Sequence, residues 1–131
     1  MTNRLLIIGG QPYLREKLTS LLNEAGFTVA HVPDYPEALA KLDELNPDIA
    51  IVDEVLPGGD GKDACSGLRN ALGIPVLLLG NDSGAEAWER AVEAGADFYF
   101  TGLVRQNELA ARVKAILRRY KSASVLRLSA S

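Results

Sequence analysis

The chain alternates between two kinds of segment that differ in the spacing of their apolar residues. Short apolar runs rich in branched side chains predict buried β-strands, and apolar residues that recur every three to four positions predict amphipathic helices. Stripes such as Leu14, Leu18 and Leu22 mark the helical segments. The strands are expected at 4–8, 27–32, 48–52, 75–79 and 97–101.

Five strands that alternate with five helical segments predict an α/β domain whose parallel sheet is covered by helices on both faces. The runs at 4–8, 48–52 and 75–79 are continuously apolar, as central strands of such a sheet should be. Functional groups in this architecture gather at the carboxyl ends of the strands. Those ends are expected at Gly9 and Gly10, at Asp53, at Gly80, and at Thr101 and Gly102.

The residues between the segments support the same division. Asp34 is placed to cap the second helix, with Glu37 three residues later. Pro12 suits the first turn of the first helix, because its missing N–H would have no helical partner there. Glycines follow the first, third and fourth helical segments, at Gly26, Gly73 and Gly95.

Composition narrows the class of protein without identifying it. The chain has 131 residues, of which 47% are hydrophobic and 24% charged, as in ordinary soluble domains. One cysteine, Cys65, excludes an internal disulfide or a multi-cysteine metal site, and we expect it in the core. His31 has no second histidine or cysteine near it, so we expect no metal there. No apolar run is long enough to span a membrane, and we expect a cytoplasmic protein.

Positive charge is concentrated towards the end of the chain. Six of the 14 Lys and Arg residues follow Glu108, the last acidic residue, although the net charge is −3. A basic final helix is one feature of nucleic-acid binding. Basic residues also suit the C-terminal end of any helix, where the helix dipole is negative. We favour the second interpretation.

Two stretches resemble a known family, the response-regulator receiver domains of two-component signalling. IVDEVLPGGDG (51–61) resembles the strand and turn around the family's phospho-accepting aspartate, and EAGADFYFTG (93–102) resembles its A-G-A-D-D-Y-L-T-K segment. NPDIAIVD, GIPVLLL and ELAARVKAILRR fall at matching intervals. The resemblance implies a flavodoxin-like, doubly wound fold with five parallel strands in the order 2-1-3-4-5 and five helices.

The resemblance also implies a division of the chain. Residues 1–121 correspond to the receiver domain, and 122–131 are expected to be a linker or a disordered tail. VLRLS at 125–129 resembles the entry into the winged-helix DNA-binding domain that follows many receivers. The tail is therefore either a route to a missing effector domain or a disordered end.

The family's phosphorylation site is largely lost when its residues are carried over. Receivers hold Mg²⁺ with two acidic residues after the first strand and an aspartate after the third. They bind the phosphoryl group with a threonine or serine after the fourth strand and a lysine after the fifth. Here only Asp53 is retained, and the other positions are Gly9, Gly10, Gly80 and Gly102. Each lost charge pair is worth about 4 kcal/mol at 4 Å and an effective dielectric of 20. We therefore expect Mg²⁺ binding to be lost or weak, with no metal site and no catalytic residue.

Gly9 and Gly10 do not replace that site with a phosphate-binding loop. GGQPYLRE lacks both the G-x-G-x-x-G spacing and the G-K-[ST] ending of such loops. Asp53 is either an inefficient phospho-acceptor or a residue that caps the following loop. Tyr99 falls at the position of the family's switch aromatic, which turns inward when the threonine or serine after the fourth strand moves towards the phosphoryl group. Gly80 occupies that threonine or serine position here. Tyr99 is fixed in one position, responds to a partner instead, or is an ordinary half-buried strand aromatic.

Two aromatic residues suggest a surface for protein contacts. Trp88 and Phe98 fall where many winged-helix regulators carry an Arg and an Asp of their dimer interface, on the fourth helix, fifth strand and fifth helix. Exposed aromatic side chains are enriched in protein interfaces. Asp97, Glu108 and Arg112 could form the polar rim of this interface. The alternative is that Trp88 turns into the core.

Together these features favour a phosphorylation-independent receiver domain that acts through protein contacts and is not an enzyme. Its expected partner is a second copy, bound through the fourth helix, fifth strand and fifth helix, or a signalling protein. DNA would be reached only through an attached output domain, and no membrane is involved. A conventional receiver phosphorylated on Asp53 is the alternative. A flavodoxin-like enzyme or cofactor binder has no supporting catalytic constellation.

Overall fold

The computed structural model describes residues 3–56, 59–80, 84–101 and 106–130. The side chains of 55, 59, 60, 62, 106, 107 and 121–130 are not part of that description. Five parallel strands form the central sheet in the order β2-β1-β3-β6-β7, which confirms the predicted order 2-1-3-4-5. Their bounds are β1 Arg4–Ile8, β2 Thr28–Val32, β3 Ile49–Asp53, β6 Val76–Gly80 and β7 Phe98–Thr101.

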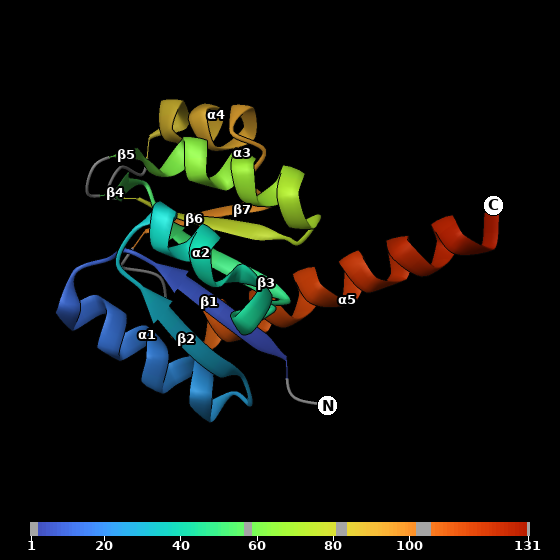
Figure 1. The fold of residues 1–131 in the computed structure, drawn as a ribbon, viewed down its shortest axis with the longest axis horizontal. Helices are drawn as coiled ribbons and strands as arrows, with labels where there is room; N and C mark the ends of the chain where they lie inside the picture. Colours follow the sequence, from blue (N-terminus) through green and yellow to red (C-terminus); the bar gives the residue numbers. More distant parts are fainter. Residues whose placement is uncertain (1–2, 57–58, 81–83, 102–105, 131) are drawn as a thin grey trace.

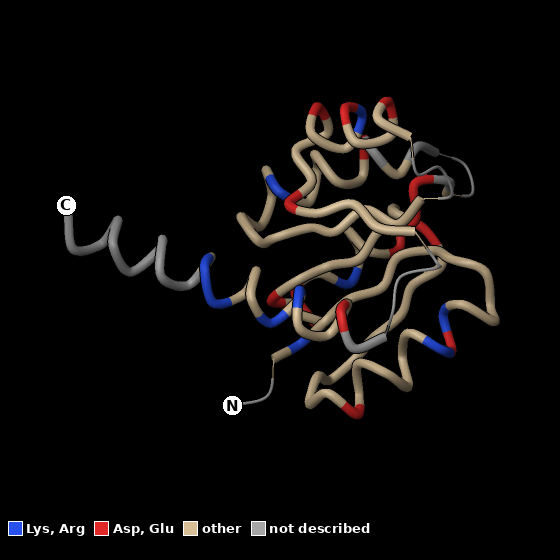
Figure 2. Tube along the Cα trace, turned by 180° about the vertical axis from the view of Figure 1, so that it is seen from behind, with Lys and Arg blue, Asp and Glu red and all other residues tan. Residues whose placement is uncertain are grey.

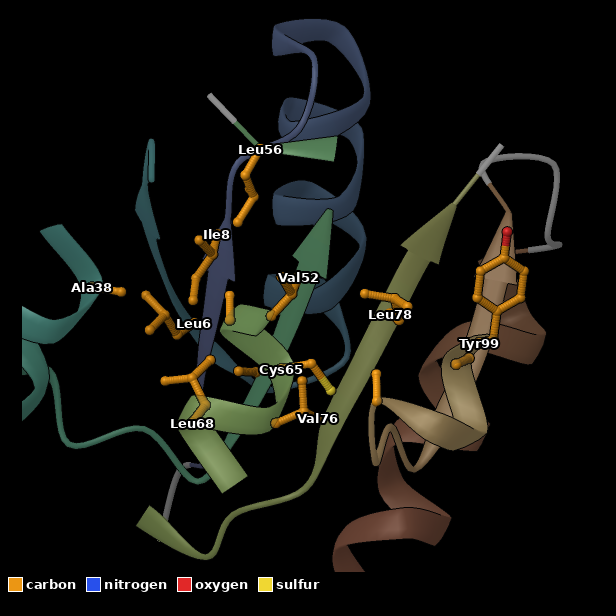
Figure 3. Packing of buried hydrophobic residues seen from close by; sticks show 14 of the residues in the cluster. Leu6, Ile8, Ala38, Val52, Leu56, Cys65, Leu68, Val76, Leu78 and Tyr99 are labelled. Atoms are coloured by element: carbon orange, nitrogen blue, oxygen red, sulfur yellow. The ribbon is translucent and has the colours of Figure 1, made fainter. Parts of the chain in front are cut away.

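The helices cover both faces of the sheet, as Figure 1 shows. Helices α1 (Pro12–Glu24) and α5 (Gln106–Ala130) lie on one face, and α2 (Tyr35–Leu45), α3 (Gly61–Leu72) and α4 (Ala85–Glu93) lie on the other. Successive residues of a strand point to opposite faces. In β1, Leu5 and Ile7 therefore join the cluster under α1 and α5, while Leu6 and Ile8 join the one under α2 to α4. Figure 3 shows the second cluster.

Local signals in the sequence mark the beginnings and the ends of the helices, as predicted. The Asp34 carboxylate accepts a hydrogen bond from the backbone N–H of Glu37 at 2.9 Å, which caps α2. Pro12 is the first residue of α1. Gly26, Gly73 and Gly95 all adopt positive φ angles after a helix.

A two-stranded hairpin after β3 was not predicted. Strands β4 (Val55–Leu56) and β5 (Gly59–Asp60) pair antiparallel, and Leu56 reaches the core with 6% of its surface exposed. Strands of two residues are too short to show an alternating pattern. The hairpin therefore became apparent only in the folded structure, where Leu56 packs into the core.

The C-terminal segment differs from the expected irregular tail. Helix α5 continues to Ala130, and Figure 1 shows its last turns extending away from the sheet. Residues 122–130 contain no glycine or proline to end a helix, and Ala, Leu and Arg favour its continuation. Neither α5 nor any other helix in the described part of the chain carries an apolar stretch that could span a membrane.

Candidate functional site

The carboxyl edge of the sheet brings the predicted site residues together. Asp53 ends β3, Gly80 ends β6, and Gly9 and Gly10 directly follow β1. A cleft of about 550 Å³ opens at this edge, and Gly9, Gly10 and the half-buried Asp53 line it. Gly102 lies outside the described residues.

Gly9 is fixed both by its backbone and by its packing. Its φ is +77°, and its N–H donates a hydrogen bond to the Val32 carbonyl at 2.9 Å. A Cβ at this position would overlap Leu56 and would lie 3.3 Å from the Asp53 Cβ. Gly10 also has a positive φ, +94°, but no atom lies within 4 Å of the place where its Cβ would be. The two glycines therefore differ: only the first is packed against the hairpin.

At the end of β6, neighbouring side chains fill the space that a side chain at Gly80 would take. A Cβ there would overlap the Tyr99 hydroxyl and would lie 2.5 Å from Glu54 Oε2. Figure 3 shows the Tyr99 ring beside β6, with its hydroxyl directed towards the carboxyl end of that strand. Tyr99 is buried, with 4% of its surface exposed. Tyr99 thus occupies an inward position that depends on a glycine at 80.

The Glu54 carboxylate is held in that region by an ion pair. Arg90 Nε of α4 donates to Glu54 Oε1 at 3.2 Å, and the two side chains are 34% and 14% exposed. The backbone N–H of Glu54 also donates to the Leu79 carbonyl at 2.7 Å. Sequence reasoning missed this pair, because 36 residues separate its members and no local pattern links them.

Among the described residues, the oxygen donors at this edge are too few to form the usual coordination shell of Mg²⁺. That ion needs several oxygen ligands in near-octahedral geometry, commonly from one or two carboxylates plus water and phosphate oxygens. Asp53 is the one carboxylate among the described residues that line the cleft, and Glu54 is paired with Arg90. Within the described ranges, no three His, Cys, Asp or Glu residues are grouped closely enough to hold a metal.

Two aromatic rings and a guanidinium form a surface cluster, which consists of Trp88, Phe98 and Arg112. The Trp88 and Phe98 rings meet edge to face, with centroids 5.9 Å apart. Arg112 places its guanidinium carbon 5.0 Å from the Phe98 ring centre, a cation–π contact. Trp88 is 47% exposed and also lies 6.1 Å from the Tyr99 ring. The indole therefore does not turn into the core, and it links the surface cluster to Tyr99.

The two predicted acidic rim residues lie in different environments. Glu108 is exposed near the start of α5, where it is free to contribute to the rim. The Asp97 carboxylate accepts hydrogen bonds from Arg69 Nη1 at 3.0 Å and from the Val76 N–H at 2.8 Å. It thereby ties the start of β7 to α3 and β6, and both of its carboxylate oxygens have partners within the domain.

A second pair that the sequence did not indicate lies in the cleft. Arg15 Nη1 of α1 is 3.2 Å from His31 Nε2 of β2. Burial, followed by the charge of Arg15, lowers the pKa of His31. Sequence reasoning treated His31 as an isolated strand residue, because only the folded sheet brings β2 beside the first turn of α1.

Comparison with families and relatives agrees with this fold. A family model described as the response regulator receiver domain matches residues 5–114. The DNA-binding response regulator MtrA of Mycolicibacterium smegmatis is 38% identical over 119 residues, which cover 91% of this chain and 52% of that protein. The sensory transduction protein RegX3 of Mycobacterium tuberculosis is 37% identical over 114 residues, with coverages of 87% and 50%. The chain spans about half the length of these relatives.

Solved structures show the same architecture. A two-component response regulator from Clostridium difficile superimposes with a TM-score of 0.83 at 29% identity, covering 90% of this chain and 98% of the other. The BeF3-activated N-terminal receiver domain of RstA from Klebsiella pneumoniae gives a TM-score of 0.82 at 25% identity, with coverages of 88% and 99%.

Proposed function

Because this chain belongs to the family of response regulator receiver domains, we propose that it is a phosphorylation-independent dimerisation module that controls an attached DNA-binding domain. Receiver domains are signalling domains of two-component systems. A conventional one changes its surface when its aspartate is phosphorylated. This chain instead carries a site poorly suited to that reaction and a surface suited to constant association.

The observation that carries the proposal is the filled space at Gly80. In the family, a hydroxyl residue at this position binds the phosphoryl group, and its movement lets the switch aromatic turn inward. Here the position offers no hydroxyl, and Tyr99 already lies inward with its hydroxyl over Gly80. Phosphorylation could therefore neither move a side chain at position 80 nor turn Tyr99 inward, because Tyr99 is already buried.

The retained acceptor also lacks the groups that stabilise phosphoryl transfer. That reaction depends on positive charge and hydrogen-bond donors placed around the transferred group. Gly9 and Gly10 supply no carboxylate for a magnesium ion at the Asp53 edge. We therefore propose that Asp53 is phosphorylated slowly or not at all.

The surface formed by α4, β7 and α5 supports a second copy as the partner. The surface cluster places two aromatic rings on this face, and Val92 of α4 is 67% exposed. Figure 2 shows mostly acidic residues on α4 and mostly basic residues on the described part of α5. A twofold arrangement that sets α4 of one protomer against α5 of its partner would be electrostatically complementary. The acidic residues of α4 are Glu86, Glu89 and Glu93, beside Arg90, which is paired with Glu54. On α5, Arg112 contacts Phe98 of this face.

The DNA-binding output is proposed from the relatives. MtrA is named a DNA-binding response regulator, and this chain covers about half of it. A receiver that dimerises without phosphorylation would hold two attached DNA-binding domains together at all times. Such a regulator would respond to its concentration or to a ligand and not to a kinase.

The mass of the protein in solution tests the dimer. Sedimentation equilibrium should give a dimer for the unmodified protein and a monomer for Trp88→Glu, because a carboxylate would be buried without a partner in the interface. Tyr13→Glu is the matched control, since Tyr13 is an aromatic residue of α1 that is 77% exposed away from this face. It should stay dimeric. A monomeric unmodified protein, or a dimeric Trp88→Glu variant, contradicts the proposed interface.

Phosphorylation is tested separately by intact-mass measurement after incubation with Mg²⁺ and acetyl phosphate. We expect no species with one added phosphoryl group, and an unchanged dimer fraction. The Asp53→Asn variant gives the background for modification elsewhere. Stoichiometric phosphorylation that Asp53→Asn abolishes would establish the alternative, a conventional receiver.

A further inference from the structure

The cleft at the carboxyl edge has a basic end that neither phosphorylation nor dimerisation explains. Arg15 and His31 lie on one side of this 550 Å³ space, and Asp53 lies on another. Both basic residues are half-buried. The volume is sufficient for a small molecule and exceeds what one ion needs.

The hydrogen bonds of His31 fix the direction of the Arg15 side chain. A guanidinium carries only N–H donors, so at 3.2 Å the Nε2 atom of His31 accepts from Arg15 Nη1. The imidazole is therefore neutral in this arrangement, with its proton on the other ring nitrogen. His31 thus orients the guanidinium without neutralising its charge.

Arg15 forms no ion pair with a carboxylate in the part of the chain that the structure describes. The ion pairs found there join Lys41 to Glu37, Arg69 to Asp97 and Arg90 to Glu54. A half-buried guanidinium without a counter-ion attracts anions, and its planar fork of donors matches a carboxylate or phosphate group.

The glycines make the same end of the cleft accessible. Conventional receivers place two carboxylates directly after β1, and these would repel an anion. Here these positions are Gly9 and Gly10. No atom lies within 4 Å of the point where a Cβ of residue 10 would be. The cleft has therefore lost negative charge and gained room next to Arg15.

We propose that this cleft binds a small organic anion, with a carboxylate or phosphate group paired to the Arg15 guanidinium beside His31 and the remainder of the molecule extending towards Asp53. The ligand would replace the metal and phosphoryl group of conventional receivers as the signal that this edge senses. This inference goes beyond the proposed dimerisation and does not depend on it.

The protonation of His31 is consistent with such a ligand. The groups that face the ring are Arg15 on α1, Glu37 on α2 and the backbone of Gly9 after β1, with Asp53 of β3 across the cleft. Burial and Arg15 keep the pKa of the ring low in the free protein. The negative charge of an anion bound at Arg15 would favour the protonated ring, so binding should raise this pKa and should strengthen as the pH falls towards 6.

The test uses the one histidine of the sequence, whose ring protons give a single set of proton NMR signals. The full chain is titrated at pH 6.5 with sodium phosphate and, separately, with sodium acetate, while sodium chloride keeps the ionic strength constant. We expect a saturable shift of the His31 signals with at least one of the two anions. Saturation by phosphate alone or by acetate alone identifies the group that the cleft prefers.

Matched variants locate the site. Arg15→Gln should weaken binding about tenfold or more, because a hydrogen bond to a charged group is worth about 1.5–3 kcal/mol. Lys17→Gln removes the same charge from the same helix outside the cleft, and it should bind as the unmodified protein does. Arg15→Lys keeps the charge and should retain part of the affinity. Shifts that do not saturate with either anion, or that are equal in Arg15→Gln and Lys17→Gln, overturn the proposal.

Discussion

The hydroxyl of Tyr99 lies over Gly80, in the space where the side chain of any other residue at position 80 would begin. Tyr99 comes from β7 and Gly80 from β6, and the register pairs Gly80 with Thr101, two residues beyond the tyrosine. The inward position of Tyr99 and the glycine therefore depend on each other. This pairing links the altered phosphorylation site to the surface cluster, since Trp88 contacts Tyr99.

The coupling of these two residues can be measured as a free energy of unfolding. Gly80→Ala should destabilise the protein by about 1–3 kcal/mol through overpacking. In a Tyr99→Leu background the same substitution should cost less than half as much, because the ring that it displaces is gone. Urea denaturation followed by the fluorescence of Trp88 provides both values. An equal cost in the two backgrounds would mean that Tyr99 does not occupy this space.

Replacing the two glycines after β1 with aspartate should destabilise the protein to different extents. Gly9→Asp forces a positive φ on a residue with a side chain and places its Cβ against Leu56, so we expect a loss of about 2–4 kcal/mol. Gly10→Asp meets no atom and should cost about 1–2 kcal/mol, from the backbone conformation alone. Thermal or urea unfolding compares them. A Gly9→Asp variant as stable as Gly10→Asp contradicts the packing described here.

Asp97 is expected to stabilise the fold and not the dimer. Asp97→Ala would leave the buried N–H of Val76 without its partner and remove the ion pair with Arg69, at a cost of about 1–3 kcal/mol. The exposed Glu93→Ala variant of α4 serves as the control and should change stability little. Equilibrium unfolding gives the energies, and the dimer fraction of folded Asp97→Ala should be unchanged. A selective loss of dimer in Asp97→Ala would return Asp97 to the interface.

The stability of the protein should fall between pH 7.5 and 5.5 because of His31. Its pKa is lowered from 6.5 in the folded state, so the unfolded chain binds the proton more readily as the pH passes below that value. Folding is then progressively disfavoured as the pH drops. Urea denaturation in chloride-based buffers should show a shallower pH dependence for His31→Gln. A steeper dependence in that variant would reverse the assigned direction.

Cys65 should be unreactive while the protein is folded. It is fully buried, and burial raises the pKa of its thiol to about 11. Because the thiolate is the nucleophile, a thiol reagent at pH 8 should label the native protein slowly and the urea-unfolded chain rapidly. Rapid labelling under native conditions would show that α3 opens readily or that Cys65 is accessible.

The sequence by itself determined the architecture of this protein. Continuous apolar strands such as Leu5 to Ile8, the Asp34 cap and the glycines after the helices act over a few residues, so their effect can be read from spacing alone. The order of the strands followed from the family resemblance of the segments 51–61 and 93–102. The family resemblance implied a linker or disordered tail at 122–131, whereas α5 continues to Ala130 through a stretch without glycine or proline.

Only the tertiary structure decided which side chains meet. The Glu54–Arg90 pair, the Arg15–His31 pair and the contact of Tyr99 with Gly80 join residues 16 to 36 positions apart or on different strands. Such contacts depend on side-chain directions at the edge of the folded sheet, and no local periodicity encodes them. The same dependence separates Asp97, which is bound to Arg69 and Val76, from the exposed Trp88 that lies only nine residues earlier in the chain.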